Sequence, residues 1–244
     1  MPGWMQAGGW GLLAGSALLV GAAAVYLTRI PQRIIASIMA FGAGVLLSAV
    51  AFELIGEAYD QAGMPWTASG AVAGALIYTG CNVLLARRGA RNRKRSAGRD
   101  QDGSGLALAL GALLDGIPES IVIGTSLLGG TGVSAATVAA VFISNVPEGL
   151  SSAAGLRAAG RSKTYVFALW TGIALISALA AILGYTVLGS APAVLLGWIT
   201  ALAGGAILTM VADTMIPEAY ENAHLLTGLI IVLGFLASFA LSHL

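Results

Sequence analysis

Long apolar stretches, separated by short polar connections, make up most of the chain. Six stretches contain no charged residue: 8–27, 34–52, 66–86, 165–188, 193–212 and 225–241. Two more, 106–128 and 133–156, are as long and apolar but contain three acidic residues. Because a helix needs about 20 apolar residues to cross about 30 Å of hydrocarbon, this pattern predicts eight membrane-spanning helices. We therefore expect an all-α polytopic bundle that forms a single membrane domain over residues 1–244.

Composition agrees with this pattern and excludes several other classes of protein. Of 244 residues, 57% are hydrophobic and 9% are charged, whereas soluble domains contain about 25% charged residues. The net charge of +1 provides no overall field for binding nucleic acid. Cys81 is the only cysteine, which excludes an internal disulfide and a cysteine-cluster metal site. Residues 1–6 lack the basic stretch of a secretory signal, so we interpret the first apolar segment as a retained helix.

The positions of the basic residues predict the orientation of the bundle. All twelve fall in three alternate connections, at 29–33, 87–99 and 157–163. Cytoplasmic loops retain Lys and Arg during insertion, so we expect a multi-pass cell-membrane protein with these loops in the cytoplasm and both termini outside. The basic segment 87–105 has no apolar periodicity and is interpreted as a solvated cytoplasmic linker. A lipid-headgroup or regulatory role is the alternative for this linker.

Three carboxylates are expected near the middle of the bilayer. Asp115 and Glu119 lie at the centre of the fourth predicted span, and Glu148 lies near the centre of the fifth. Each charged group at this depth costs ~2.5 kcal/mol or more. No predicted span contains a Lys or Arg, so the compensating positive charge must be a proton or a bound cation.

The two acidic spans contain similar local sequences. Each has a polar residue, then a proline, then a glutamate: Asp115-Gly116-Ile117-Pro118-Glu119-Ser120 and Ser144-Asn145-Val146-Pro147-Glu148-Gly149. In each, a polar side chain and the glutamate are four residues apart, on one face of a helix and within joint reach of one ion. The prolines free the carbonyls of Leu114 and Ile143 and are expected to bend the helices.

These paired motifs resemble those of the ZIP (Zrt/Irt-like) family of metal transporters, whose motif is His-Asn-x-Pro-Glu-Gly. The resemblance extends to the eight spans, the external termini and the variable linker after the third span. It implies transport of zinc, iron, manganese or cadmium toward the cytoplasm, a site between the fourth and fifth helices, a homodimer and elevator-like alternating access. By motif position it implies metal ligation by five residues: Asp115, Glu119, Ser144, Asn145 and Glu148.

The chain departs from the family at several ligand positions. Asp115 and Ser144 stand where the family has histidine, and Gly116 stands where it has asparagine. Ser177 occupies the position at which many bacterial relatives have a glutamate on the sixth helix, which argues against a complete second metal site. An oxygen-only ligand set favours manganese, iron(II) or magnesium, although carboxylates also bind zinc.

Other polar residues are candidates for an ion pathway. Glu53 follows the second span on the expected outer side, with Glu57 and Asp60 beyond it. Asp213 and Glu218 end the seventh span on the expected cytoplasmic side, where an acidic Pro-Glu pattern also resembles the family. A solvated helix end is the alternative for each of these acids. His224 and His243 lie away from the span centres and are interpreted as interfacial residues.

Two other functions fit the same acids. One is a pathway for protons or monovalent cations, and the other is a metal sensor that does not transport. An enzyme is disfavoured, because no HExxH-type helix or other recognisable catalytic motif occurs in the spans.

Overall fold

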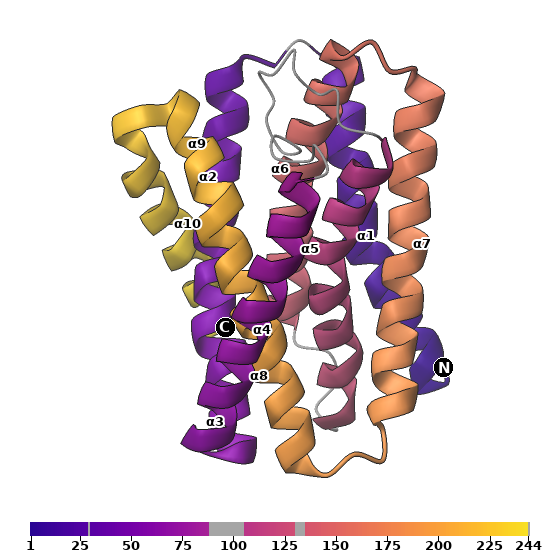
Figure 1. Ribbon diagram of the computed structural model, residues 1–244, viewed down its shortest axis with the longest axis vertical. Coiled ribbons are helices and arrows are strands. Elements are labelled where there is room, and N and C mark those ends of the chain that lie inside the picture. Colours follow the sequence, from indigo (N-terminus) through magenta and orange to yellow (C-terminus); the bar gives the residue numbers. More distant parts are fainter. Residues whose placement is uncertain (29, 88–104, 130–134, 244) are drawn as a thin grey trace.

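The computed structural model describes residues 1–28, 30–87, 105–129 and 135–243, and this part of the chain is helical throughout apart from short connections and turns (Figure 1). The predicted linker at 87–105 lies almost wholly outside these residues. The longer helices are α1 (Gly3–Leu27), α2 (Gln32–Ser48), α4 (Met64–Leu85), α5 (Gly105–Ser126), α6 (Ala135–Ala158), α7 (Lys163–Leu188), α8 (Ala193–Met210) and α10 (Thr227–Leu241).

Short helical pieces extend several of these helices. The π-helical segment η1 (Ala49–Ile55) joins α2 to α3 (Gly56–Ala62), and a second π-helical segment, η4 (Val211–Met215), joins α8 to α9 (Ile216–Ala223). The 3-10 turns η3 (Leu127–Gly129) and η5 (His224–Leu226) follow α5 and α9. The acids that follow the second predicted span, Glu53, Glu57 and Asp60, therefore lie in a helical continuation of α2.

The prolines of the two motifs do not interrupt their helices. α5 runs through Pro118 and α6 runs through Pro147 as continuous α-helix. The departures from α-helical geometry fall instead in η1 and η4, which contain Glu53 and Asp213. Single π-helical turns inside α-helices occur frequently at functional sites.

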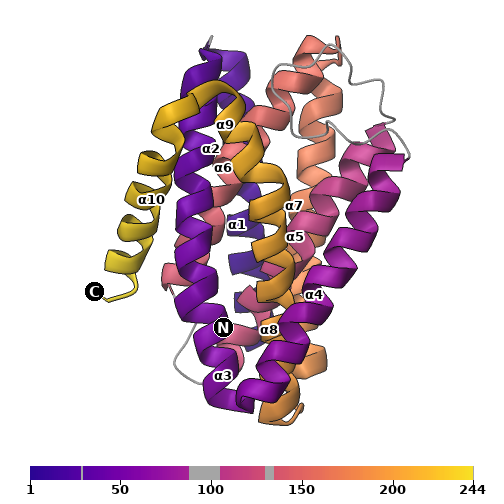
Figure 2. The same ribbon diagram turned by 60° about the vertical axis from the view of Figure 1, so that its left-hand side comes forward.

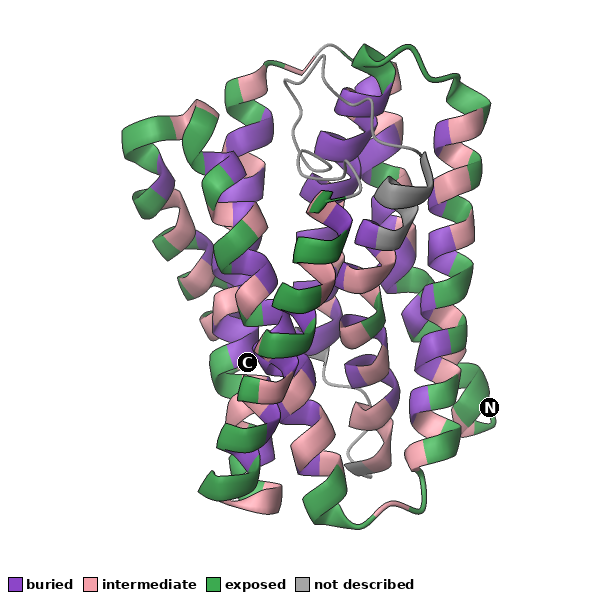
Figure 3. Ribbon diagram, in the orientation of Figure 1, coloured by how far each residue is buried: buried purple, intermediate pink, exposed green. Residues whose placement is uncertain are grey.

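Five helical stretches of the described chain are long and apolar enough to cross a membrane: Gly3–Leu27, Gln32–Ala62, Met64–Leu85, Lys163–Leu188 and Ala193–Leu241. Figure 1 shows the last of these folding back on itself at α9. Large apolar side chains point outward from these helices, for example Leu76, Leu183 and Leu229, and buried residues face the interior (Figure 3). This inversion of the soluble pattern is typical of a membrane-embedded bundle.

The helices form two closely packed groups. In the first group α1 packs along α6 and α7, and α5 packs along α7; in the second, α4 packs along α8 and α2 packs along α10, with α3 and α9 against α8 and α2. The groups touch mainly where α2 meets α6 and α8 meets α5. In both views α2, α9 and α10 lie together at one side of the bundle; α7 lies at the opposite side in Figure 1, and α4 and α5 lie there in Figure 2.

Reciprocal glycines hold the helices of each group close together. A Cβ on Gly74 of α4 would clash with the carbonyl oxygen of Leu202 on α8, and one on Gly205 of α8 would clash with that of Ala71 on α4. Gly44 and Gly234 do the same for α2 and α10, and Gly21 and Gly149 do so for α1 and α6. Such backbone-to-backbone packing through small residues is the usual basis of tight helix association in membranes.

The same pattern of helix contacts occurs twice in the bundle. The α1–α6 pair corresponds to α7–α5, and the α2–α10 pair corresponds to α8–α4. A π-helical segment follows both α2 and its counterpart α8. α1 and α7, which pack on each other, run in opposite directions in Figure 1. This is the arrangement of an inverted repeat, in which binding sites lie between the repeats. The two acidic helices, α5 and α6, correspond to each other in it.

Candidate metal site

All five residues predicted as metal ligands are buried. Relative exposure is 2% for Asp115, Glu119 and Ser144, 4% for Glu148 and 5% for Asn145. α5 presents Asp115 and Glu119, and α6 presents the other three. Carboxyl groups are rarely buried to this degree without a charged or hydrogen-bonding partner, so the surroundings of each acid decide what the site can do.

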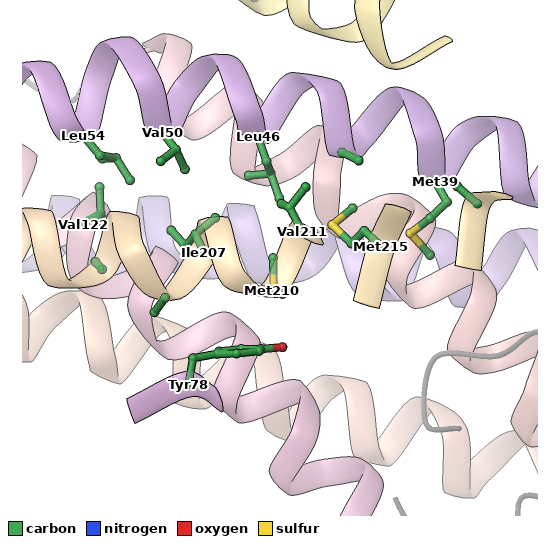
Figure 4. Packing of buried hydrophobic residues seen from close by; sticks show 14 of the residues in the cluster. Met39, Leu46, Val50, Leu54, Tyr78, Val122, Ile207, Met210, Val211 and Met215 are labelled. Atoms are coloured by element: carbon green, nitrogen blue, oxygen red, sulfur yellow. The ribbon is translucent and has the colours of Figure 1, made fainter. Parts of the chain in front are cut away.

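Asp115 is fixed by a residue that the sequence analysis missed. The hydroxyl of Tyr78 on α4 donates a 2.7 Å hydrogen bond to Oδ1 of Asp115. Tyr78 is 1% exposed, and its ring packs beside Ile207 and Met210 in the core of the second helix group (Figure 4). A tyrosine near the middle of an uncharged span was the available signal, because a buried phenol needs a hydrogen-bond partner.

The α6 half of the site is set against α1 and α2. Asn145 donates from Nδ2 to the carbonyl oxygen of Ala14 on α1, at 3.1 Å, and the Ser144 hydroxyl donates to the carbonyl oxygen of Val141, at 2.9 Å. A Cβ on Gly42 of α2 would lie 3.4 Å from Cα of Ser144. Both side chains donate a hydrogen to a backbone carbonyl. The amide oxygen of Asn145 and the hydroxyl oxygen of Ser144 are still chemically able to bind a cation.

Two acids of the predicted pathway lie at opposite ends of α6. Glu53 in η1 is half-buried and accepts a 3.0 Å hydrogen bond at Oε2 from the hydroxyl of Thr137. Glu218 in α9 is 6% exposed and accepts at Oε1 from the hydroxyl of Ser151. Neither Thr137 nor Ser151 was predicted as a site residue. Thr137 lies seven residues before Ser144, and Ser151 lies three residues after Glu148, so both lie on the same face of α6 as the proposed ligands. This spacing could have identified them from the sequence.

The remaining candidates differ from one another in exposure. Ser177 of α7 is buried, and its Oγ lies 3.6 Å from where a Cβ on Gly116 would be, so it faces α5 beside Asp115. Asp213 is exposed. His243 lies at the end of the chain against Phe239, with ring centroids 4.3 Å apart, and His224 forms a turn after α9.

Basic groups within the described helices are held at the helix ends. Arg157 is nine residues beyond Glu148 on α6, about 13.5 Å along the axis. Its Nη1 donates to the carbonyl oxygen of Val25, and its guanidinium lies 5.4 Å from the centre of the Tyr26 ring. Lys163 lies 5.5 Å from the same ring. These cations form a cluster with aromatic residues at one end of α1, away from the buried acids.

The buried acids are not gathered into one cluster. Among residues 1–28, 30–87, 105–129 and 135–243, no group of three or more His, Cys, Asp or Glu side chains is placed to hold a metal ion. α5 and α6 approach each other only over a short stretch. Each helix thus presents its own pair of oxygen ligands, Asp115 with Glu119 and Ser144 with Glu148, each about one helical turn apart.

Comparison with known proteins assigns no family. No family model matches the chain, and no curated protein matches it. The resemblance to ZIP transporters therefore rests on the paired motifs and the sequence pattern described above.

Proposed function

We propose that this chain is a membrane transporter of divalent metal ions, similar to the ZIP family, that moves zinc, manganese or iron(II) toward the cytoplasm. One observation carries the proposal: Asp115, Glu119 and Glu148 are each buried, in a stretch of sequence, 105–156, that contains no Lys or Arg. A divalent cation supplies the positive charge that such acids need. A protein that only packed its helices would gain nothing from three carboxyl groups at this depth.

The proposed site is shared between α5 and α6. Asp115 and Glu119 bind the ion from one helix, and Glu148, Asn145 and Ser144 bind it from the other. The cargo ion exchanges its hydration shell for these oxygens, and its charge offsets theirs. Ser177 faces the same region and is a candidate for a further contact.

The proposed transport cycle uses the boundary between the two helix groups. The first group, with both acidic helices, moves against the second and exposes the ion to one side and then to the other. Glu53 and Glu218 lie at opposite ends of α6 and are proposed to receive the ion on the outer and cytoplasmic sides, with Asp213 near the exit. Support comes from the extensive packing within each group and the limited contact between them.

The membrane arrangement proposed for this cycle has eight spans. They are α1, α2 with its extension through α3, α4, α5, α6, α7, α8 and α10. Both termini lie outside, the basic connections lie in the cytoplasm, and two copies form a dimer. The support is the alternate placement of the twelve basic residues and the positive-inside rule. The dimer is proposed only from the resemblance.

Uptake by a Glu148→Ala variant tests this function. Purified full-length protein is reconstituted in liposomes, and the uptake of zinc and manganese is measured from outside to inside. We expect the Glu148→Ala variant to fall to the rate of empty liposomes, because it loses the carboxylate of the α6 half-site. Glu221→Ala is the matched control, since it removes the same side chain at an exposed position of α9. Wild-type rates in the Glu148→Ala variant would refute the proposal.

A further inference from the structure

Tyr78 is an unusual residue for its helix. α4 faces outward along most of its length, and only 17% of the residues in its most apolar stretch are buried. Tyr78 is 1% exposed and extends into the interior, where its hydroxyl donates to Oδ1 of Asp115 at 2.7 Å. A phenylalanine would fill the same space in the apolar core. The hydroxyl therefore has a role beyond packing, and its partner is a proposed metal ligand.

The position of Tyr78 is set largely by the packing of α4 against α8. Gly74 is one helical turn before it on the same face of α4, and this glycine brings the backbone of α4 against that of α8. The Tyr78 ring packs beside Ile207 and Met210 on the same α8 surface (Figure 4). A ring held in this way directs its hydroxyl to one place, and the second helix group thereby fixes an oxygen of Asp115 in the first.

We propose that Tyr78 determines the metal preference of the site by holding Asp115 in one-oxygen coordination. The inference rests on the proposed transport function and concerns its selectivity. A hydroxyl that donates to Oδ1 occupies one of its lone pairs and fixes the plane of the carboxylate. An ion then gains at most one strong bond from Asp115 rather than two.

The limit of one strong bond from Asp115 affects zinc and manganese differently. Zinc prefers four ligands and takes one oxygen from each carboxylate at about 2.0–2.2 Å. Manganese prefers six oxygen ligands, and ions with high coordination numbers accept both oxygens of one carboxylate. Removing the Tyr78 hydroxyl makes the second oxygen of Asp115 available and favours manganese over zinc.

The test is a competition between the two metals. Proteoliposomes containing wild-type protein, Tyr78→Phe or Tyr26→Phe receive equal concentrations of zinc and manganese, and both metals inside are measured by mass spectrometry. Tyr26 is the control because its ring lies at the end of α1 beside Arg157, far from the acids in sequence and among basic groups. The ratio of the two metals is independent of the amount of folded protein.

We expect Tyr78→Phe to raise the ratio of manganese to zinc uptake about three- to tenfold, the change that corresponds to one net hydrogen bond. Tyr26→Phe should keep the wild-type ratio. An unchanged or lower ratio in Tyr78→Phe, or an equal loss of both metals, would overturn the inference.

With an Asp115→Asn variant added, the same experiment distinguishes a failure of the proposed transport function from a failure of the inference about Tyr78. If wild-type protein takes up neither metal, the transport function fails and the selectivity inference fails with it. If wild-type protein takes up metal, Asp115→Asn loses uptake and Tyr78→Phe keeps the wild-type ratio, only the inference about Tyr78 is wrong.

Discussion

Two kinds of helix contact in this molecule differ in chemistry. Within each helix group, backbones meet through glycines such as Gly74 and Gly205, and a Cβ at either position would clash with a carbonyl oxygen. Between the groups, hydrogen bonds among the described residues include three that have a carboxylate as acceptor: Tyr78 to Asp115, Thr137 to Glu53 and Ser151 to Glu218. Glycine contacts hold helices together, whereas carboxylate contacts depend on charge and on what else binds the acid.

This difference indicates where the molecule is rigid and where it is adjustable. Close backbone packing tolerates little displacement, because interiors are packed as densely as crystals. A hydrogen bond typically contributes only ~0.5–1.5 kcal/mol to stability, and a donor bound to a carboxylate competes directly with a cation for the same oxygen. Variants of the two kinds of contact should therefore affect different properties.

The largest effect should come from removing an acid at the boundary between the groups. Glu119→Gln keeps the size of the side chain and removes its charge, so we expect metal uptake to fall to the rate of empty liposomes. Stability in detergent without metal should stay equal or rise, because a charged group at this depth costs ~2.5 kcal/mol or more and glutamine is neutral. Uptake assays and thermal unfolding of the same sample measure both. A large loss of stability together with normal uptake would show that Glu119 stabilises the fold and does not bind the ion.

An intermediate effect should come from filling a glycine contact. Gly74→Ala places a methyl group against the backbone of α8, and overpacking of this kind costs about 1–3 kcal/mol. Gly80→Ala on the same helix is the control, since nothing lies within 4 Å of the added Cβ. Thermal unfolding should show a lower Tm for Gly74→Ala alone. Equal Tm values for the two variants would mean that α4 and α8 are not held by backbone contact.

The smallest effect should come from the hydrogen bonds at the ends of α6. Ser151→Ala removes the donor to Glu218, and the loss of one buried hydrogen bond corresponds to a change of about two- to tenfold. We expect the apparent KM or the maximal uptake rate to change within that range. Ser152→Ala, at a neighbouring buried serine, is the control. A variant Ser151→Ala with wild-type kinetics would remove Ser151 from the pathway.

The general architecture and the burial of the site could be predicted from the sequence because both follow from local patterns. Apolar length predicts spanning helices, and structure confirms an all-helical chain over the described residues, with five stretches that meet the requirement. The burial of Asp115, Glu119 and Glu148 follows from their place in the middle of the two acidic apolar segments, 106–128 and 133–156, which are not among those five stretches. The count of eight spans and the orientation stay predictions.

The contacts between distant segments could not be predicted in this way. Tyr78 meets Asp115 across 37 positions of the chain and Thr137 meets Glu53 across 84, and no local rule relates residues so far apart. The π-helical segments were also missed, because η1 and η4 contain no Gly or Pro to indicate them. α5 and α6 continue as α-helix through Pro118 and Pro147, and the bend expected at these two prolines stays a prediction.

Uptake by the wild-type protein under defined gradients is the most direct test of a divalent cation among the buried acids. Proteoliposomes are given zinc or manganese outside, with no gradient of protons or potassium, and internal metal and internal pH are followed together. We predict saturable uptake of the divalent metal that competes between zinc and manganese. A flux of protons or potassium that proceeds without any divalent metal, and no uptake of either metal, would contradict the proposed function.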